Sequence, residues 1–117
     1  MFKPALERIL NGCEDALAVV IMGFDGIIVD SVEEGLQTDL QSFAGEFSFV
    51  LNQMVKVAES LEWGALDETV INSDKFAFVV RVLSSEYFLT LVTKADGNLG
   101  KGRFLMRLAL PDLRAEI

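Results

Sequence analysis

The sequence contains no histidine and a single cysteine, Cys13, among its 117 residues. Without histidine, the chain cannot form a histidine-based triad, and it lacks the commonest general base and the usual zinc ligand. One cysteine excludes an internal disulfide and fits a reducing compartment. Cys13 is expected to be a small buried residue rather than a nucleophile. We therefore expect no catalytic residues, no metal site and no cofactor, and we do not expect an enzyme.

Long apolar runs and basic residues are also scarce. The longest uncharged apolar run, residues 16–24, is too short to span a bilayer, and the first ten residues lack the layout of a secretory signal. Ten Lys and Arg residues against 18 Asp and Glu residues give a net charge of −8. This balance argues against nucleic-acid binding and against adsorption to an anionic membrane. We expect a cytoplasmic protein with no direct membrane insertion.

Apolar residues, by contrast, are abundant, at 51% of the chain. A length of 117 residues predicts one domain, residues 1–117, with one core. A domain of this size has little with which to cover so much apolar surface. We therefore expect part of the apolar surface to be covered by association with another chain.

Residues 36–63 form the stretch around which the rest of the chain is organised. Apolar residues recur there at steps of four and three, and therefore lie on one face of a helix. They are Leu36, Leu40, Phe43, Phe47, Val50, Met54, Val57 and Leu61. A second row beside the first consists of Ala44, Leu51, Val55 and Ala58.

Together the two rows cover about 160° of the helix surface. A helix that lies on a single sheet usually needs an apolar stripe of only about 100°. The extra width predicts that this helix packs on its own sheet and also on something outside the monomer. The alternative is one large helix buried within its own domain.

Five strands and two shorter helices are predicted for the rest of the chain. The strands are residues 16–22, 27–30, 67–73, 76–83 and 87–93, and the helices are residues 2–10 and 99–110. Short links between strands indicate antiparallel pairing. Strand 27–30, with its acidic end, and strand 67–73, with few apolar residues, are expected at the sheet edges. The order of elements predicts an α+β domain with helices on the faces of one sheet.

Some helix boundaries are predicted from local signals. Either Ser31 with Glu34 or Thr38 with Gln41 is suited to a capping box at the start of the long helix, and Gly64 is a suitable stop. In the last helix we expect Phe104, Leu105 and Leu108 to point inward. The basic residues Lys101, Arg103 and Arg107 are expected to point outward. We expect Pro111 to end that helix and the tail beyond it to fray.

Three segments together resemble the roadblock (dynein light-chain) domain family, most nearly its bacterial and archaeal homodimeric branch. They are residues 18–31 (AVVIMGFDGIIVDS), residues 44–64, and residues 68–110, in which Asn98-Leu99-Gly100 leads into the last helix. That branch includes gliding-motility regulators of small Ras-like GTPases. The resemblance implies a roadblock/profilin-like fold: a five-stranded antiparallel sheet with the long helix on one face and two shorter terminal helices on the other.

The resemblance also implies a homodimer. In the family, the edge strand after the long helix pairs with its copy, and the long helices lie antiparallel across the same axis. Carried over, the interface consists of Phe43, Phe47, Val50, Leu51, Met54, Thr69, Val70, Ile71 and Asn72. Independent physical support comes from the hazard of an uncovered edge, which pairing with an identical copy removes.

Three residues are candidates for contact with another partner. Phe49 and Trp63 fall outside the main apolar row and are suited to anchor a partner, or else they pack against loops at the helix ends. Arg81 is a single charge inside an apolar strand. It is either an arginine finger acting on a GTPase or, more simply, a strand arginine with a packed stem and a solvated head.

The leading hypothesis is a homodimeric regulatory module that binds a small Ras-like GTPase, with acceleration of GTP hydrolysis as an activity to test. The alternative is a non-catalytic scaffold or adaptor subunit of the dynein light-chain type. A small-ligand sensor is less favoured, because a ligand pocket needs converging polar groups. The central strands offer few besides Arg81, Ser84, Thr90 and Thr93.

Overall fold

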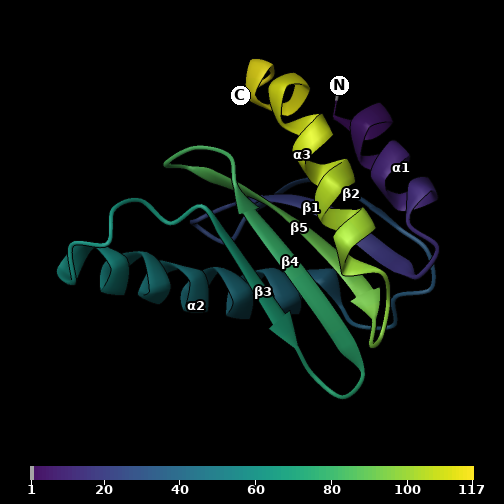
Figure 1. The fold of residues 1–117 in the computed structure, drawn as a ribbon, viewed down its shortest axis with the longest axis horizontal. Coiled ribbons are helices and arrows are strands. Elements are labelled where there is room, and N and C mark those ends of the chain that lie inside the picture. The colour runs from purple at the N-terminus through teal and green to yellow at the C-terminus, as the bar shows by residue number, and fades with distance from the viewer. Residues whose placement is uncertain (1) are drawn as a thin grey trace.

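The computed structural model describes residues 2–117, and the elements follow the predicted order (Figure 1). They are α1 (Lys3–Gly12), β1 (Ala16–Gly23), β2 (Ile28–Glu33), α2 (Leu40–Ser60), β3 (Glu68–Asn72), β4 (Phe76–Val82), β5 (Tyr87–Lys94) and α3 (Leu99–Ala115). No helix within residues 2–117 has both the length and the apolar composition needed to cross a membrane.

The five strands form one antiparallel sheet in the order β2-β1-β5-β4-β3. Both edge predictions are confirmed, because β2 and β3 are the outer strands. All eight residues of β1 are buried, which explains why its sequence is continuously apolar rather than alternating. The acidic end predicted for β2 extends the strand, since Glu33 pairs with Ala18 of β1.

Helices cover both faces of the sheet, as the predicted fold class requires. In Figure 1, α2 passes behind β3 and β4, and α1 and α3 lie at the top of the view, on the other face of the sheet. One apolar core, which includes Leu6, Ile9, Leu89 and Met106, fills the space between the sheet and α1 and α3. A second core, built around Phe88, lies between the sheet and α2.

Helix α2 begins later than predicted, and neither proposed capping box forms. Asp39 is the N-cap residue, and its carboxylate accepts hydrogen bonds from the backbone N–H groups of Gln41 and Ser42, both at 3.4 Å. Ser31 lies in β2 instead. The helix ends before Gly64, because Glu62 takes the left-handed conformation at φ 58°. The N–H groups of Glu62 and Trp63 then bond back to the carbonyls of Glu59 and Ala58, as in a Schellman motif.

Helix α3 differs from the prediction in its end. It continues through Pro111 to Ala115, so Pro111 does not stop it. The last turns are held in place because Leu113 is buried in the core and Arg114 donates hydrogen bonds to the carbonyl oxygens of Leu83 and Val82. These contacts offset the hydrogen bond that proline cannot donate within the helix.

The inward face of α3 also differs from the prediction. Its buried residues are Gly102, Met106, Ala109, Leu110 and Leu113. Phe104 and Leu108, expected inside, are 48% and 60% exposed, whereas Leu105 packs against the core as expected. Gly102 sets this rotation, because a Cβ atom there would lie 2.4 Å from Cδ2 of Leu91. The bare glycine therefore lets the helix lie close to β5.

Candidate protein-interaction site

The wide apolar stripe of α2 divides into two parts. Ala44, Ser48, Leu51 and Ala58 are buried against the sheet. In the other row, Val50, Val57 and Leu61 remain 47%, 47% and 55% exposed. Helix α2 therefore packs on its own sheet with one part of the stripe and leaves the other part open, which is the surface we expected a partner to cover.

Phe43, Phe47 and Met54 lie between these two parts and are half-buried. The ring centroids of Phe43 and Phe47 are 4.8 Å apart, and both rings approach Phe78 of β4, at 5.8 and 5.6 Å. Phe78 pairs with Ile71 of β3. This aromatic cluster therefore continues the apolar surface of α2 toward the β3 edge of the sheet.

Strand β3 pairs with β4 on one side, and within residues 2–117 no strand lies along its other side. Thr69 and Ile71 are opposite Val80 and Phe78, which pack on the α2 side. Val70 is opposite Val79, which packs on the other side, so Val70 and Asn72 face α1 and α3. The four predicted edge residues are therefore divided between the two faces of the sheet.

Leu51 does not belong to an exposed surface. Its side chain is 1% exposed and lies in the core between α2 and the sheet. One residue step turns a helix by about 100°, which takes Leu51 away from the exposed Val50 and toward the sheet. The prediction that Leu51 lies in the dimer interface is therefore wrong. Leu51 packs between α2 and the sheet and supports the helix from beneath.

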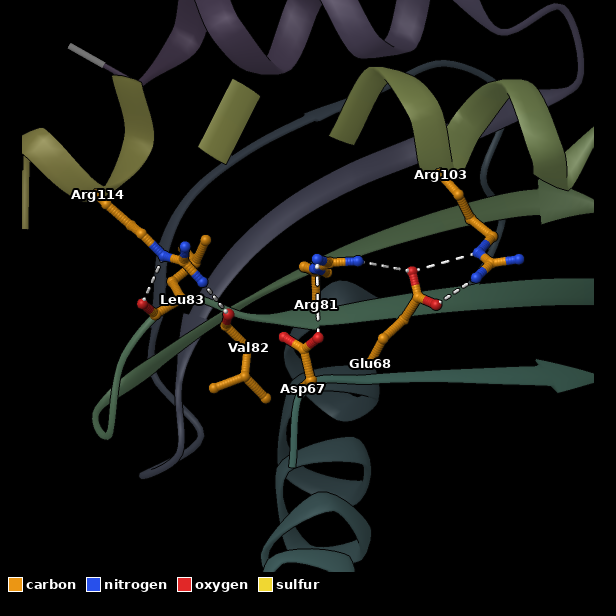
Figure 2. A network of polar contacts seen from close by, with 7 residues as sticks. All are labelled: Asp67, Glu68, Arg81, Val82, Leu83, Arg103 and Arg114. Atoms are coloured by element: carbon orange, nitrogen blue, oxygen red, sulfur yellow. Dashed lines mark hydrogen bonds and ion pairs between the residues drawn. The ribbon is translucent and has the colours of Figure 1, made fainter. Parts of the chain in front are cut away.

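Arg81 forms part of an ion-pair network on the face opposite α2 (Figure 2). Its Nη1 donates to Oε2 of Glu68 at 3.2 Å, and its Nη2 lies 3.8 Å from Oδ2 of the exposed Asp67. Arg103 of α3 donates to both carboxylate oxygens of Glu68, at 2.6 and 3.2 Å. Arg103 is the largest cause that lowers the pKa of Glu68, followed among the lowering causes by Arg81.

This network changes the interpretation of Arg81. Its side chain is only 20% exposed, and its head is paired with carboxylates rather than solvated. Arg81 is also opposite Leu89 in the sheet, and Leu89 packs toward α1 and α3. Arg81 therefore lies across the sheet from α2 and is not brought together with Phe49, so these two residues do not form one partner site.

Phe49 and Trp63 are 62% and 71% exposed. This exposure rules out the alternative in which loops at the helix ends cover them. Phe49 adjoins Val50 on the exposed part of α2. Trp63 follows the C-terminus of the helix, and the hydrogen bond from its N–H to the carbonyl of Ala58, at 2.9 Å, fixes its backbone. Both aromatic side chains are thus presented to solvent from ordered backbone.

A hollow of about 630 Å³, which was not predicted from the sequence, lies between α2, the loop after it and the end of β4. Two of its polar side chains already form hydrogen bonds: Arg114 donates to the carbonyls of Val82 and Leu83, and Asn52 donates to the carbonyls of Phe24 and Ser48. Thr90 and Thr93, considered for a sensor pocket, are fully buried in the sheet. Neither threonine lines the hollow, whose other polar side chains are Glu59, Asp67, Ser84 and Ser85.

Few other residues are of a type that could act as a nucleophile or a metal ligand. Cys13 is buried, as expected, and burial raises the pKa of its thiol. A raised pKa keeps the sulfur protonated and a poor nucleophile at neutral pH. No group of three or more His, Cys, Asp and Glu side chains within residues 2–117 is placed to hold a metal ion. The exposed features are those of a protein-interaction surface.

Comparison with known proteins supports this description. No protein-family profile and no curated protein sequence matches the chain. Among solved structures, MglC from Myxococcus xanthus is 42% identical, with 99% of this chain and 98% of that chain covered and a TM-score of 0.73.

Two further structures share the fold at low sequence identity. An MglB described as having a tetrameric arrangement is 18% identical, with 97% of this chain and 85% of that chain covered and a TM-score of 0.87. The Roadblock/LC7 domain from Streptomyces avermitilis is 14% identical, with 96% and 93% covered and a TM-score of 0.83. With its five-stranded sheet, its three helices and 42% identity to MglC over nearly its whole length, the chain belongs to the Roadblock/LC7 domain family.

Proposed function

We propose that this protein is a homodimeric regulatory module that binds a small Ras-like GTPase. The observation that carries the proposal is the exposed apolar row of α2, which continues through the Phe43, Phe47 and Phe78 cluster to the open edge of β3. Contiguous apolar surface of this kind marks protein-interaction sites. Resemblance to the homodimeric branch of the family supports the same function.

In the proposed dimer, β3 pairs with its own copy and the two α2 helices lie against each other. Backbone groups of Thr69, Val70, Ile71 and Asn72 supply the strand contact. Phe43, Phe47, Val50 and Met54 supply the helix contact. One isologous patch closes the assembly at two chains and removes the exposed strand edge.

Phe49 and Trp63 are the proposed anchors for the GTPase, because exposed aromatic side chains are frequent hot spots of protein interfaces. Any acceleration of hydrolysis would come from ordering the switch residues of the GTPase itself. Arg81 is not the proposed finger, since it is paired with Glu68 and lies across the sheet from Phe49.

Single-turnover GTP hydrolysis by the small Ras-like GTPase of the same organism, with and without this protein, tests the proposal. A binding measurement with GTP-loaded and GDP-loaded GTPase accompanies it. Preference for one nucleotide state is expected of a regulator, since equal affinity shifts no equilibrium. Binding without preference and without acceleration would favour the alternative, an adaptor of the dynein light-chain type. Absence of binding would overturn the proposed GTPase interaction and leave only the fold and the proposed dimer.

A further inference from the structure

Helix α3 presents a basic and apolar face that the proposed GTPase site does not use. Phe104 and Leu108, one helical turn apart, are 48% and 60% exposed. The guanidinium carbon of Arg107 lies 5.8 Å from the centroid of the Phe104 ring, in a cation–π arrangement. We call the side chains of Lys101, Arg103, Phe104, Arg107 and Leu108 the α3 face.

The charge of this face is opposite to that of the chain as a whole. Residues 99–110 include three basic side chains and no acidic one, in a protein of net charge −8. Within residues 2–117, Arg107 and Lys101 form no ion pair, whereas Arg103 is paired with Glu68. Two cations beside two exposed apolar side chains are therefore left for a partner.

A hollow of about 190 Å³ adjoins the α3 face, where α3 crosses the β3–β4 pair. Arg81, Arg103 and Arg107 line it, and Glu68 is the one carboxylate among them. Asp67 also pairs with Arg81 from outside the lining, at 3.8 Å, so three guanidinium groups against two carboxylates leave the hollow with a net positive charge. Arg81 Nε is buried there without a hydrogen-bond partner. Guanidinium groups pair well with a carboxylate because two parallel N–H donors match its two oxygens.

We propose that the α3 face and this hollow form a second docking surface, whose occupant is an acidic amphipathic segment of another protein. Carboxylates of the segment pair with Arg107 and Lys101, and its apolar side chains cover Phe104 and Leu108. Charge complementarity favours this occupant over nucleic acid, since the phosphate backbone would meet only a few cations on a strongly acidic protein. The surface lies on the opposite side of the sheet from α2, so it is independent of the proposed GTPase site.

The probe is a fluorescein-labelled synthetic helical peptide of 14 residues, with Glu on one face and Leu on the other. Fluorescence anisotropy measures its affinity for the full chain, for Arg107→Glu and for Leu108→Ser. The matched control is Lys56→Glu, which makes the same change of charge at an exposed position of α2. We expect Arg107→Glu to weaken binding at least tenfold, Leu108→Ser to weaken it several-fold, and Lys56→Glu to leave it unchanged.

Two further probes separate recognition from simple charge attraction. A peptide with Lys in place of Glu is expected not to bind, and one with Ser in place of Leu is expected to bind weakly. Backbone amide shifts on adding the acidic peptide are expected to cluster at residues 100–108 and 68–70. Equal weakening by Arg107→Glu and Lys56→Glu, or amide shifts confined to α2, would overturn the proposal.

Two more measurements decide between occupants. An assembly larger than a dimer that Arg107→Glu abolishes would identify the occupant as a second copy of this chain and overturn the partner proposed here. GTPase binding by Arg107→Glu is expected to equal that of the wild type. If the protein does not bind a GTPase, the peptide result is unaffected. If the peptide does not bind to the α3 face, the proposed GTPase site is unaffected.

Discussion

Glu68 on the edge strand β3 accepts both hydrogen bonds of the Arg103 guanidinium on α3, at 2.6 and 3.2 Å. Arg81 of β4 donates to the same carboxylate at 3.2 Å. One acidic side chain therefore connects three elements on the face opposite α2 (Figure 2). Its own side chain is 17% exposed, so salt and solvent screen the network less than they would an open surface pair.

The first prediction concerns the pH dependence of stability through Glu68. Arg103, and then Arg81, hold the pKa of this carboxyl below its ordinary value of 4.5. The stabilisation is thus fully present above the ordinary pKa and is lost as the pH falls through the lower, folded-state pKa. Glu68→Gln should lower the free energy of unfolding at pH 7, and its difference from wild type should shrink below pH 4.5.

Urea unfolding between pH 3 and pH 7 measures that difference. Glu46→Gln, at an exposed position of α2, is the control and should follow the wild type throughout. A constant difference between Glu68→Gln and wild type over the whole range would contradict the ion-pair explanation.

The second prediction concerns the close approach at Gly102. A Cβ atom there would meet Leu91 Cδ2 at 2.4 Å, and Leu91 is fully buried and has little room to move. Gly102→Ala should therefore lower the free energy of unfolding by about 1–3 kcal/mol through overpacking, despite the higher helix propensity of alanine. Gly100→Ala, where the nearest atom is 3.5 Å away, should be neutral or gain up to about 1 kcal/mol. Equal stability of the two variants would contradict the packing argument.

The sequence predicted the sheet and the two apolar rows of α2 because both depend on local periodicity. It did not predict which row stays exposed, since the expected dimer interface included both Val50 and Leu51. The steps of four and three along α2 placed Val50 and Leu51 in different rows, and the structure exposes the first and buries the second. The same reasoning was wrong for α3. There Phe104 and Leu108 form one apolar row and Met106 and Leu110 form another, so periodicity favours neither.

What decides between the rows of α3 is contact with distant parts of the chain, which local patterns do not contain. Gly102 rests on Leu91 of β5, and Arg114 reaches the carbonyls of Val82 and Leu83, about thirty residues away. The ion-pair network is of the same kind, since Glu68 and Arg103 are 35 positions apart. The outward orientation of Lys101, Arg103 and Arg107 was predicted and is confirmed, but the exposure of Phe104 and Leu108 beside them was missed for this reason.

The third prediction concerns the start of α2. The Asp39 carboxylate caps two backbone N–H groups and also accepts a hydrogen bond from the Ser42 hydroxyl at 3.0 Å. Asp39→Ala should lower the free energy of unfolding by about 1 kcal/mol, the usual cost of a lost N-cap. Asp39→Ser, which keeps a capping oxygen, should recover most of the loss. Thermal unfolding followed by circular dichroism measures both, and equal losses in the two variants would show that capping is not the cause.

The fourth prediction separates the two rows of α2. Val50→Asp should convert the proposed dimer to a monomer, with a solution mass near 12.9 kDa, because it places a charge in the apolar contact. Leu51→Ala should leave the mass of folded protein at twice that value. It should lower the free energy of unfolding by about 2–5 kcal/mol, the usual cost of a buried leucine-to-alanine change.

Light scattering gives the mass and urea unfolding gives the stability of each variant. Gln53→Asp, at an exposed position of the same helix, is the control for an added charge and should remain dimeric. A monomeric wild-type protein at micromolar concentration would contradict the proposed interface before any variant is compared.

The last prediction concerns Phe49 and Arg81, which were both proposed from the sequence as residues that contact a partner. Phe49 is 62% exposed on α2, so Phe49→Ser should leave the fold intact and weaken GTPase binding by about 2 kcal/mol, as expected for an aromatic hot spot. Arg81 is held by Glu68 and faces away from α2. Arg81→Met should therefore destabilise the β3–β4 region yet leave the hydrolysis rate at saturating concentration unchanged. A large loss of that rate in folded Arg81→Met, with binding retained, would instead restore Arg81 as a finger and require Glu68 to release it in the complex.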